Sequence, residues 1–211
     1  VSFGGRIKQM YPHSFLVLVG THPSACAEET LGYSKAVDAV AIGEYDETIK
    51  ELADAIENRE ELLQVRGLCL RQGETFIRTG IMPSIKNLDE IPFASTFIKN
   101  NLNERDYFFA AATYPSIQIF TGRGCPFHCN FCVYPQTMHG HIFRARSAEN
   151  VVNEFEYIAE NFPDVKEVVI EDDTFTVNKK RVLEICNLLI NKGLNKRLKW
   201  LCNARVNLDY E

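Results

Sequence analysis

Cys125, Cys129 and Cys132 lie within eight positions of one another, in the stretch GCPFHCNFC. Thiolates are strong ligands for zinc and for iron–sulfur clusters, and three thiols in one short loop are too crowded for a conventional disulfide framework. The chain contains seven cysteines, an odd number, which also argues against a complete set of disulfides. The pattern therefore predicts a metal site or a redox centre.

The number of thiols separates the possible kinds of centre. A structural zinc site normally takes four ligands as two separated pairs, and the sequence offers no second pair. An ordinary [4Fe-4S] ferredoxin site uses a fourth cysteine, but Cys186 and Cys202 fall in a predicted helix and a predicted strand, where both resemble small core residues. Cys26 and Cys69 lie in an earlier part of the chain. Three thiolates on a four-iron cluster would leave one iron open to bind another molecule.

The sequence around the cysteines resembles the radical S-adenosylmethionine (SAM) superfamily. Members carry Cys-x3-Cys-x2-Cys after a first strand, with an aromatic residue before the third cysteine, and Phe131 holds that position here. The stretches TGRGCPFHCNFCVYPQT, GHIFRARSAENVVNE, EDDTFT and WLCNARV are similar to the branch in which a cobalamin (B12)-binding domain precedes the radical SAM barrel. The PQT and GH details resemble a hopanoid-biosynthesis-associated group within that branch.

The N-terminal third is predicted to alternate between strand and helix. SFLVLVG and AVDAVAIG are apolar runs of strand length, and VRGLCLR and TFIRTG, separated by QGE, predict a hairpin. LVGTHPS, VDAVAIGEYDETIKEL and IKNLDEIPF resemble the second half of a B12-binding domain and its linker. The stretch DETIKELADAIENRE predicts a helix with one apolar face, formed by Ile49, Leu52, Ala53 and Ile56.

The alternation restarts at Ser116, after an irregular stretch. The strands SIQIFT, KEVVIE and LKWLCNA are joined by two predicted helices, of which the first has Ser147 as its N-cap and the second is closed by Gly193. Strands joined by helical crossovers run parallel, and such crossover connections are right-handed. The carboxyl ends of all three strands are therefore expected on the same face.

We expect an α/β fold made of two incomplete domains. Residues 1–80 are predicted to be the C-terminal half of a Rossmann-like B12-binding domain, residues 81–115 a linker, and residues 116–211 the first three β/α units of a TIM-type radical SAM barrel. The chain starts with Val1 in place of Met and ends at Glu211 without a capping signal, so we expect it to be a piece of a longer protein.

Polar residues follow the second and third strands of the predicted barrel part, and in β/α barrels the C-terminal ends of strands carry the chemistry. The resemblance implies that one of Glu171, Asp172 and Asp173 binds the amino group of SAM, while the others can simply cap the following turn. It also implies that Asn203 and Arg205 contact SAM. Arg205 would pair with the methionine carboxylate of SAM or, alternatively, form a salt bridge with Asp172 or Glu171.

The resemblance also implies the cofactors and the reaction. Cys125, Cys129 and Cys132 would hold a [4Fe-4S] cluster with SAM at the open iron, and Phe131 would line the adenine side or anchor the loop. The reduced cluster would cleave SAM to methionine and a 5'-deoxyadenosyl radical, which abstracts hydrogen from an unreactive carbon. Cobalamin, the third expected cofactor, would support methyl transfer to, or rearrangement of, a lipid or other hydrophobic metabolite. The expected partners are a small-molecule substrate and an electron donor such as flavodoxin or ferredoxin.

Two functions from other classes fit parts of the pattern. An iron–sulfur electron-transfer module would require Cys186 or Cys202 beside the loop as a fourth ligand. A non-catalytic cobalamin-binding protein would leave the strand-end acids and Arg205 pointing away from the cluster.

Composition excludes further classes of function. The formal charge of −5 argues against nonspecific nucleic-acid binding, which relies on a basic surface. The longest apolar candidate, FLVLVG, is far shorter than the roughly 18 to 20 residues of a membrane span. Val1 is followed by a polar, glycine-containing stretch and not by a signal-peptide pattern, so a cytoplasmic location is expected.

We expect anaerobic reconstitution with iron and sulfide to load about four irons per chain, as a cubane site requires. Replacing Cys125, Cys129 and Cys132 with alanine should abolish this loading, whereas Cys26→Ala should leave the iron content unchanged. Iron and sulfide analysis of the purified proteins checks both outcomes. A triple variant that keeps a full cluster would contradict the assignment of the three ligands.

Overall fold

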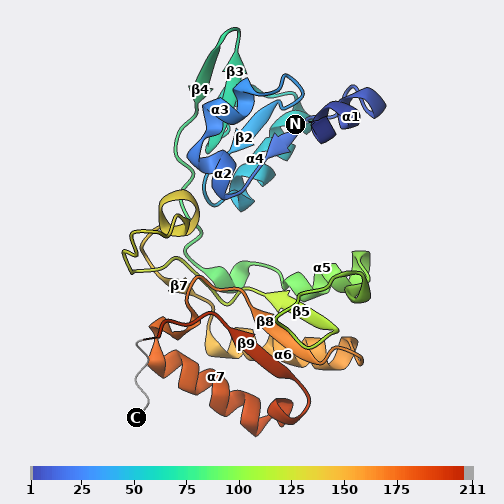
Figure 1. Cartoon of the computed structure of the whole chain (residues 1–211), viewed down its shortest axis with the longest axis vertical. Coiled ribbons are helices and arrows are strands. Elements are labelled where there is room, and N and C mark those ends of the chain that lie inside the picture. Colours follow the sequence, from blue (N-terminus) through green and yellow to red (C-terminus); the bar gives the residue numbers. More distant parts are fainter. Residues whose placement is uncertain (1, 207–211) are drawn as a thin grey trace. The chain divides into compact units, whose positions relative to one another are not determined.

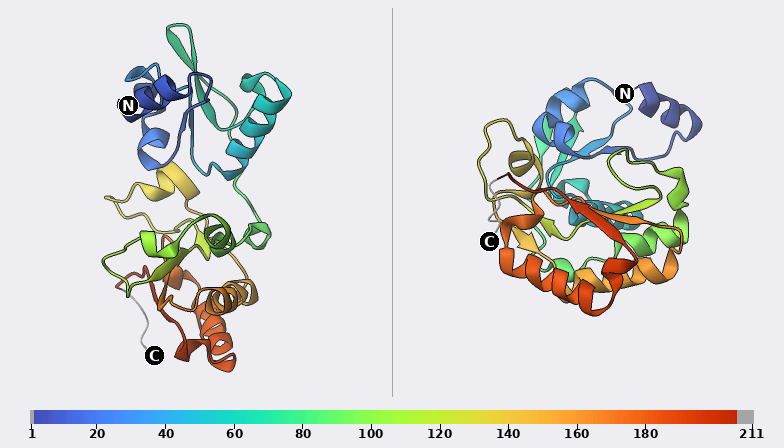
Figure 2. Two further views of the ribbon diagram at one scale, coloured as in Figure 1. Left: turned by 90° about the vertical axis from the view of Figure 1, so that its right-hand side faces the viewer. Right: turned by 60° about the horizontal axis from the view of Figure 1, so that its bottom comes forward.

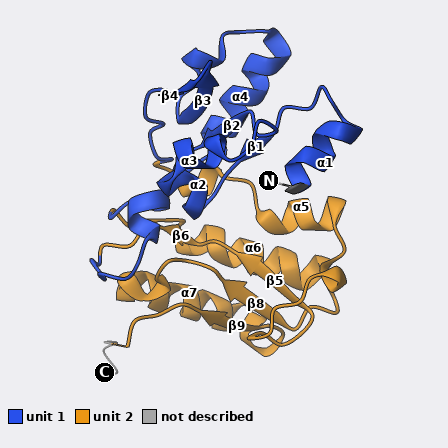
Figure 3. Cartoon of the chain, turned by 45° about the horizontal axis from the view of Figure 1, so that its top comes forward, with its two compact units in different colours: residues 1–85, 127–141 blue, residues 86–126, 142–211 orange. Residues whose placement is uncertain are grey.

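The computed structural model describes residues 2–206 and divides the chain into two compact units (Figure 3). Unit 1 comprises the residues up to 85 together with residues 127–141, and unit 2 comprises residues 86–126 and those from 142 onward. Unit 1 has two core clusters, and unit 2 has one larger cluster. Each unit therefore buries an apolar core of its own.

Unit 1 is built on a four-stranded sheet. Its strands are β1 (Val17–Leu18), β2 (Ala39–Ala41), β3 (Leu68–Gln72) and β4 (Thr75–Arg78), in that spatial order (Figure 1). β1 and β2 are parallel, whereas β3 is antiparallel to both of its neighbours. Ala39 and Ala41 face one core cluster and Val40 faces the other, because successive side chains of a strand point to opposite faces. The predicted hairpin is confirmed as β3 and β4.

The helices of unit 1 include one whose buried face differs from the prediction. The predicted helix is confirmed as α4, but its buried residues are Thr48, Leu52 and Ala55, while Ala53 and Ile56 are exposed. The three buried residues are spaced i, i+4 and i+7 and form one narrow stripe along the helix. A prediction based only on apolar residues could not include the polar threonine in that stripe. The helical elements are α1 (Ser2–Met10), α2 (Thr21–Ala25), α3 (Ala27–Gly32), α4 (Asp46–Asn58) and the 3-10 turn η1 (Leu62–Gln64).

Unit 2 contains a three-stranded parallel sheet, as the sequence predicts. Its strands are β5 (Ser116–Ile119), β8 (Glu167–Ile170) and β9 (Lys199–Cys202), joined by α6 (Ala148–Asn161) and α7 (Lys179–Asn191). β8 lies in the middle and pairs in parallel with both other strands. The two crossover helices pack on the same face of the sheet and against each other (Figures 1 and 2). The carboxyl ends of the three strands consequently lie at one edge.

Local sequence determines where α6 and α7 begin. Ser147 caps α6, since its Oγ accepts a hydrogen bond from the Asn150 amide at 3.1 Å. Asn178 caps α7 in the same way, accepting from the Arg181 amide at 3.1 Å. The apolar face of α6 is buried at Val151, Val152, Phe155 and Ile158. Two 3-10 turns flank α7, η5 (Phe175–Val177) and η6 (Leu194–Lys196).

Residues 86–115, most of the predicted linker, are folded into unit 2. Leu88 is 2% exposed, and the amide and hydroxyl of Ser95 both donate to Glu154 Oε1, at 3.2 and 2.9 Å. The polar composition of this stretch indicates an irregular connection, but the buried hydrogen bonds of Ser95 fix it against α6. The elements are η2 (Leu88–Glu90), α5 (Ala94–Asn101) and η3 (Glu104–Asp106). The first boundary between the units along the chain therefore falls near residue 85.

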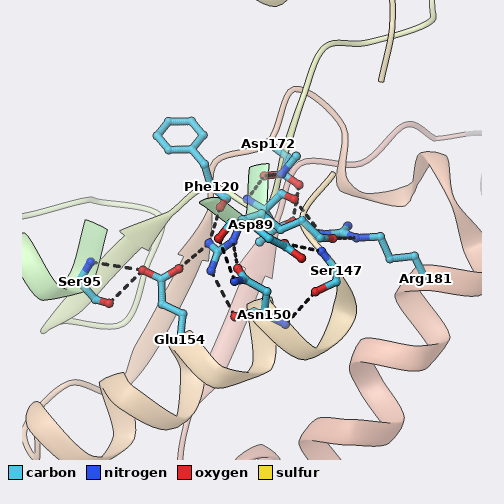
Figure 4. Close-up of polar contacts among 11 residues, drawn as sticks. Asp89, Ser95, Phe120, Ser147, Asn150, Glu154, Asp172 and Arg181 are labelled. Carbon is cyan, nitrogen blue, oxygen red and sulfur yellow. Dashed lines mark hydrogen bonds and ion pairs between the residues drawn. The ribbon is translucent and has the colours of Figure 1, made fainter. Parts of the chain in front are cut away.

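Glu154 also forms a buried ion pair. Arg146 Nη1 lies 2.5 Å from Glu154 Oε2, and the two side chains are 8% and 0% exposed (Figure 4). The guanidinium of Arg146 also lies over the Phe93 ring, 5.1 Å from its centroid. A buried carboxylate is tolerated only with charge and hydrogen-bond partners, so Glu154 depends on both Arg146 and Ser95.

None of the helices in residues 2–206 could cross a membrane. The longest of those described, α6, has 14 residues. At about 1.5 Å per residue it is roughly 21 Å long, against about 30 Å for the hydrocarbon core of a bilayer.

We expect Glu154→Gln to lower the free energy of unfolding of unit 2 by about 3 kcal/mol, because it leaves the buried Arg146 cation without its anion. Trp200, the only tryptophan of the chain, belongs to β9 and packs against Phe175 with 5.5 Å between ring centroids. Its fluorescence in a denaturant titration therefore reports on unit 2.

Glu156→Gln is the matched control on the same helix. It removes an ion pair with Lys192 whose side chains are 41% and 39% exposed, and exposed pairs contribute little to stability. We expect this variant to unfold close to the wild type. Equal losses in the two variants would contradict the role given to the buried pair.

Candidate functional site

A buried carboxylate ties together the carboxyl ends of β5 and β8. Asp172 follows β8 and is 1% exposed. Its Oδ1 accepts the amides of Thr121 and Gly122 at 2.6 and 2.9 Å, and its Oδ2 accepts the Thr121 hydroxyl at 2.6 Å (Figure 4). Both oxygens are therefore bonded to the residues that lead from β5 toward the cysteine loop.

The surroundings of Asp172 have two opposing effects on the ionisation of its carboxyl group. Burial raises the pKa of Asp172, while the hydrogen bonds from Thr121 and Gly122 and the positive charge of Arg181 act in the opposite direction. The contacts favour the second of the two sequence-based interpretations of Asp172, a side chain that fixes a turn. Its role as a ligand of SAM stays a prediction.

The other polar residues after the strands lie at the same edge. Asp173 Oδ2 accepts the amide of Gly124 at 3.0 Å, directly before Cys125. Asn203, after β9, donates from Nδ2 to the carbonyl of Asp172 at 3.2 Å. Glu171 accepts a hydrogen bond from Gln118 of β5 at 3.3 Å. The structure thus brings the three predicted acids and Asn203 to the strand ends, as the parallel topology requires.

The two ends of the cysteine loop are held together by a short ladder that the sequence did not predict. β6 (Gly122–Arg123) and β7 (Arg144–Ala145) pair antiparallel, and the amide of Arg146 donates to the carbonyl of Thr121 at 2.9 Å. We call residues 121–123 and 144–146 the neck of the loop. A Cβ at Gly122 would lie 2.8 Å from the Phe143 ring and 3.2 Å from Asp172 Oδ2, so the neck requires glycine there.

The side chains of the three loop cysteines are partly exposed. Cys125 belongs to unit 2, whereas Cys129 and Cys132 belong to unit 1, where the Cys132 amide donates to the Cys129 carbonyl at 3.1 Å. Within residues 2–206, no group of three or more His, Cys, Asp and Glu side chains is arranged to hold a metal ion. Three thiols are a donor set whose chemistry suits an iron–sulfur cluster.

Three of the remaining cysteines are much poorer candidates for ligands. Burial raises the pKa of Cys69, of Cys186 in α7 and of Cys202 in β9, which disfavours the thiolate that a metal requires. Cys69 is fully buried, Cys202 is partly buried against the core of unit 2, and Cys186 is partly buried in α7. They behave as core side chains, as the sequence predicts for Cys186 and Cys202.

Phe131 and Arg205 differ in how exposed their side chains are. The Phe131 side chain is 85% exposed, which disfavours its interpretation as a buried anchor of the loop and leaves the adenine-side interpretation as a prediction. Arg205 is half-buried and lies three residues beyond the end of β9.

Sequence reasoning missed Arg181, which contacts both sides of the neck from α7. Its Nη2 donates to the Thr121 carbonyl and its Nε to the Arg146 carbonyl, each at 2.8 Å. A signal was present, because residue 181 is four residues before Ile185 and eight before Leu189, both of which are buried. An arginine in line with a buried helical stripe indicates a buried charge with a specific partner.

Comparison with known proteins shows which proteins this chain resembles. Residues 119–209 match the profile of the radical SAM superfamily. The chain is 34% identical over 200 residues to an uncharacterized methyltransferase of Pyrococcus horikoshii, a match that covers 95% of the chain and 42% of the relative. It is 29% identical over 201 residues to the anaerobic magnesium-protoporphyrin IX monomethyl ester cyclase of Cereibacter sphaeroides, covering 94% of the chain and 32% of the cyclase. The chain thus spans less than half the length of these curated relatives.

Solved structures with the same fold match nearly the whole chain. The cobalamin-dependent SAM radical enzyme OxsB, with aqua-cobalamin and SAM bound, aligns with a TM-score of 0.75 and 18% identity over 100% of this chain and 29% of its own. The radical SAM methyltransferase TsrM from Kitasatospora setae, with tryptophan and a SAM analogue bound, aligns with a TM-score of 0.67 and 17% identity over 94% of this chain and 38% of its own. At these identities the likeness concerns the fold.

We expect Asp172→Ala to destabilise unit 2 strongly, by about 3 kcal/mol or more, because it leaves the donors of Thr121 and Gly122 buried without an acceptor, at about 1 to 3 kcal/mol each. A denaturant titration followed by Trp200 fluorescence measures the loss.

Asp173→Ala is the neighbouring control. Asp173 is half-buried, and its hydrogen bond to the Gly124 amide is partly open to solvent, so we expect a clearly smaller loss. If the two variants unfold at the same denaturant concentration, Asp172 does not have the central role assigned to it.

Proposed function

Because residues 119–209 match the profile of the radical SAM superfamily, we propose that this protein is an enzyme that cleaves SAM at a [4Fe-4S] cluster held by Cys125, Cys129 and Cys132. The observation that carries the proposal is that these three partly exposed thiols lie in one loop whose neck is fixed at the carboxyl edge of a parallel sheet. When bound and reduced, such a cluster supplies the electron that splits SAM into methionine and a 5'-deoxyadenosyl radical.

The chain's own residues would bind and orient SAM at the edge of the sheet. Arg205 offers a guanidinium for the methionine carboxylate, and Glu171 and Asp173 offer carboxylates for the amino group. Asn203 would align this group of side chains, because its hydrogen bond to the Asp172 carbonyl ties β9 to β8. Phe131 would cover the adenine ring with its exposed side chain. Asp172 would serve mainly to hold the residues before the loop in place.

Cobalamin is proposed as the third cofactor, with unit 1 as part of its binding domain and unit 2 as the first three β/α units of the barrel. Supporting this, the match to the cobalamin-dependent enzyme OxsB extends over both units. The relatives include methyltransferases and a cyclase of a magnesium porphyrin ester. We therefore propose methyl transfer to, or rearrangement at, an unreactive carbon of a hydrophobic small molecule. A flavodoxin or ferredoxin would supply the electron.

The two alternative functions have less support. An iron–sulfur electron-transfer module would need a fourth thiolate, but burial raises the pKa of both Cys186 and Cys202. A non-catalytic cobalamin-binding protein would have no use for acids turned toward the loop, yet Asp172 and Asp173 bond to residues 121–124 immediately before Cys125.

The proposed function is tested by anaerobic reconstitution followed by incubation with SAM and dithionite. We expect four irons per chain, and methionine and 5'-deoxyadenosine as products detected by chromatography and mass spectrometry. A chain that loads four irons but yields neither product would favour an electron-transfer role.

We expect Arg205→Met to weaken SAM binding at least about tenfold while leaving the iron content unchanged, because it removes a charged hydrogen bond to the ligand and not a ligand of the metal. Anaerobic titration calorimetry measures the affinity.

Arg105→Met is the control for loss of an arginine in unit 2. Arg105 pairs with Asp164 at 2.6 Å on the surface, where the side chains are 51% and 59% exposed. Its replacement should not change SAM binding. Unchanged affinity in the Arg205 variant would remove that residue from the proposed site.

A further inference from the structure

Arg181 is a buried cation inside unit 2. It is 7% exposed and lies on the face of α7 that carries Ile185 and Leu189. Burial lowers its pKa, and the negative charge of Asp172 opposes that effect. Placing a guanidinium in the protein interior is costly unless hydrogen bonds satisfy it, so the acceptors it contacts indicate its purpose.

Those acceptors are one carbonyl on each side of the neck. Thr121 precedes the cysteine loop and accepts from Nη2 at 2.8 Å, and Arg146 follows the loop and accepts from Nε at 2.8 Å (Figure 4). The donors of a guanidinium are fixed in one plane, so a side chain that bonds both carbonyls fixes their separation. Within residues 2–206, Nη1 of Arg181 has no hydrogen-bond partner, so two neck carbonyls orient the group.

Other contacts hold the same backbone from different directions. Arg146 Nη1 donates to the carbonyl of Phe120 at 2.7 Å, next to the Thr121 carbonyl that Arg181 uses. On the opposite side of the chain, Asp172 accepts the amides of Thr121 and Gly122. Hydrogen bonds therefore hold both the carbonyls and the amides of the neck. Helix α7 supplies two of these hydrogen bonds through Arg181.

The loop beyond the neck is much less regular. Residues 124–133, which include all three cysteines, form neither helix nor strand. A cluster that binds there must order this segment, and the entropic cost of ordering a loop falls when its two ends are already fixed.

We propose that Arg181 is a positioning residue for the cysteine loop, which locks the neck from α7 and thereby determines how firmly the loop retains a cluster. This inference rests on the proposed function, because the cluster is the same one. Arg181 does not contact the cluster in this proposal and acts through Thr121 and Arg146.

The test uses the full chain, reconstituted anaerobically, and measures the rate at which a colorimetric chelator removes iron. We expect Arg181→Met to lose iron about tenfold faster than the wild type, since a charge-assisted hydrogen bond is worth about a factor of ten. Arg181→Lys keeps the charge but can satisfy only one carbonyl well, so its rate should be intermediate. The electron paramagnetic resonance spectrum of the reduced cluster should broaden in the Met variant and recover partly in the Lys variant.

Arg197→Met is a closely matched control. Arg197 also donates to main-chain carbonyls, those of Val165, Phe162 and Pro163 at 2.6, 2.9 and 2.8 Å, but these lie between α6 and β8, at the amino-terminal end of the strands. Its loss should destabilise unit 2 in Trp200 fluorescence while leaving the rate of iron loss at the wild-type value.

The outcomes separate the inference from the function on which it rests. A wild-type chain that loads no four-iron cluster overturns the proposed function. If the wild type loads normally and Arg181→Met loses iron no faster than Arg197→Met, only the inference fails. Should Arg181→Met not fold, Arg181→Lys decides: iron loss faster than in both the wild type and Arg197→Met supports the inference, and an unchanged rate overturns it.

Discussion

The hydrogen bonds of one buried carboxylate hold the candidate site together. Beyond the carboxyl end of a strand, backbone amides no longer have a neighbouring strand to donate to and need other acceptors. The amides of Thr121 and Gly122, which follow β5, donate to Asp172. Because Asp172 follows the central strand β8, it fixes the end of β5 against the middle of the sheet. Asn203 then joins the end of β9 to the Asp172 carbonyl. Hydrogen bonds of Asp172 thus connect the ends of all three strands.

Buried charges in unit 2 occur in compensating groups. Arg146 pairs with Glu154, which also accepts from Ser95, and Arg181 lies in the field of Asp172. Each guanidinium also donates to main-chain carbonyls next to or within the neck. Burying charged side chains costs free energy because they lose their hydration. In return, their hydrogen bonds and ion pairs favour one defined arrangement of the backbone. Here the arrangement so defined is the exit from β5 toward the cysteine loop.

The chain separates the frame from the reactive groups. The frame consists of the sheet, its two helices and the neck, which are buried and hydrogen-bonded. The reactive groups are partly exposed thiols in a segment without regular structure. Burial raises the pKa of Cys186 and Cys202 in the frame, so thiolate chemistry is disfavoured there. This division allows a loop to adapt to a cofactor while its ends stay in place.

The sequence by itself determined the cysteine spacing, the three strands with their helices, and, through crossover geometry, the shared edge where residues 171–173 and Asn203 meet. These features follow from local patterns of apolar residues, caps and turns. Only the tertiary structure decided that residues 86–115 pack into unit 2, that Asp172 is enclosed by Thr121 and Gly122, and that Arg181 reaches the neck. Each of these depends on contacts between segments about 35 to 60 positions apart, and a buried charge is chosen by the partner it meets, which no local pattern contains.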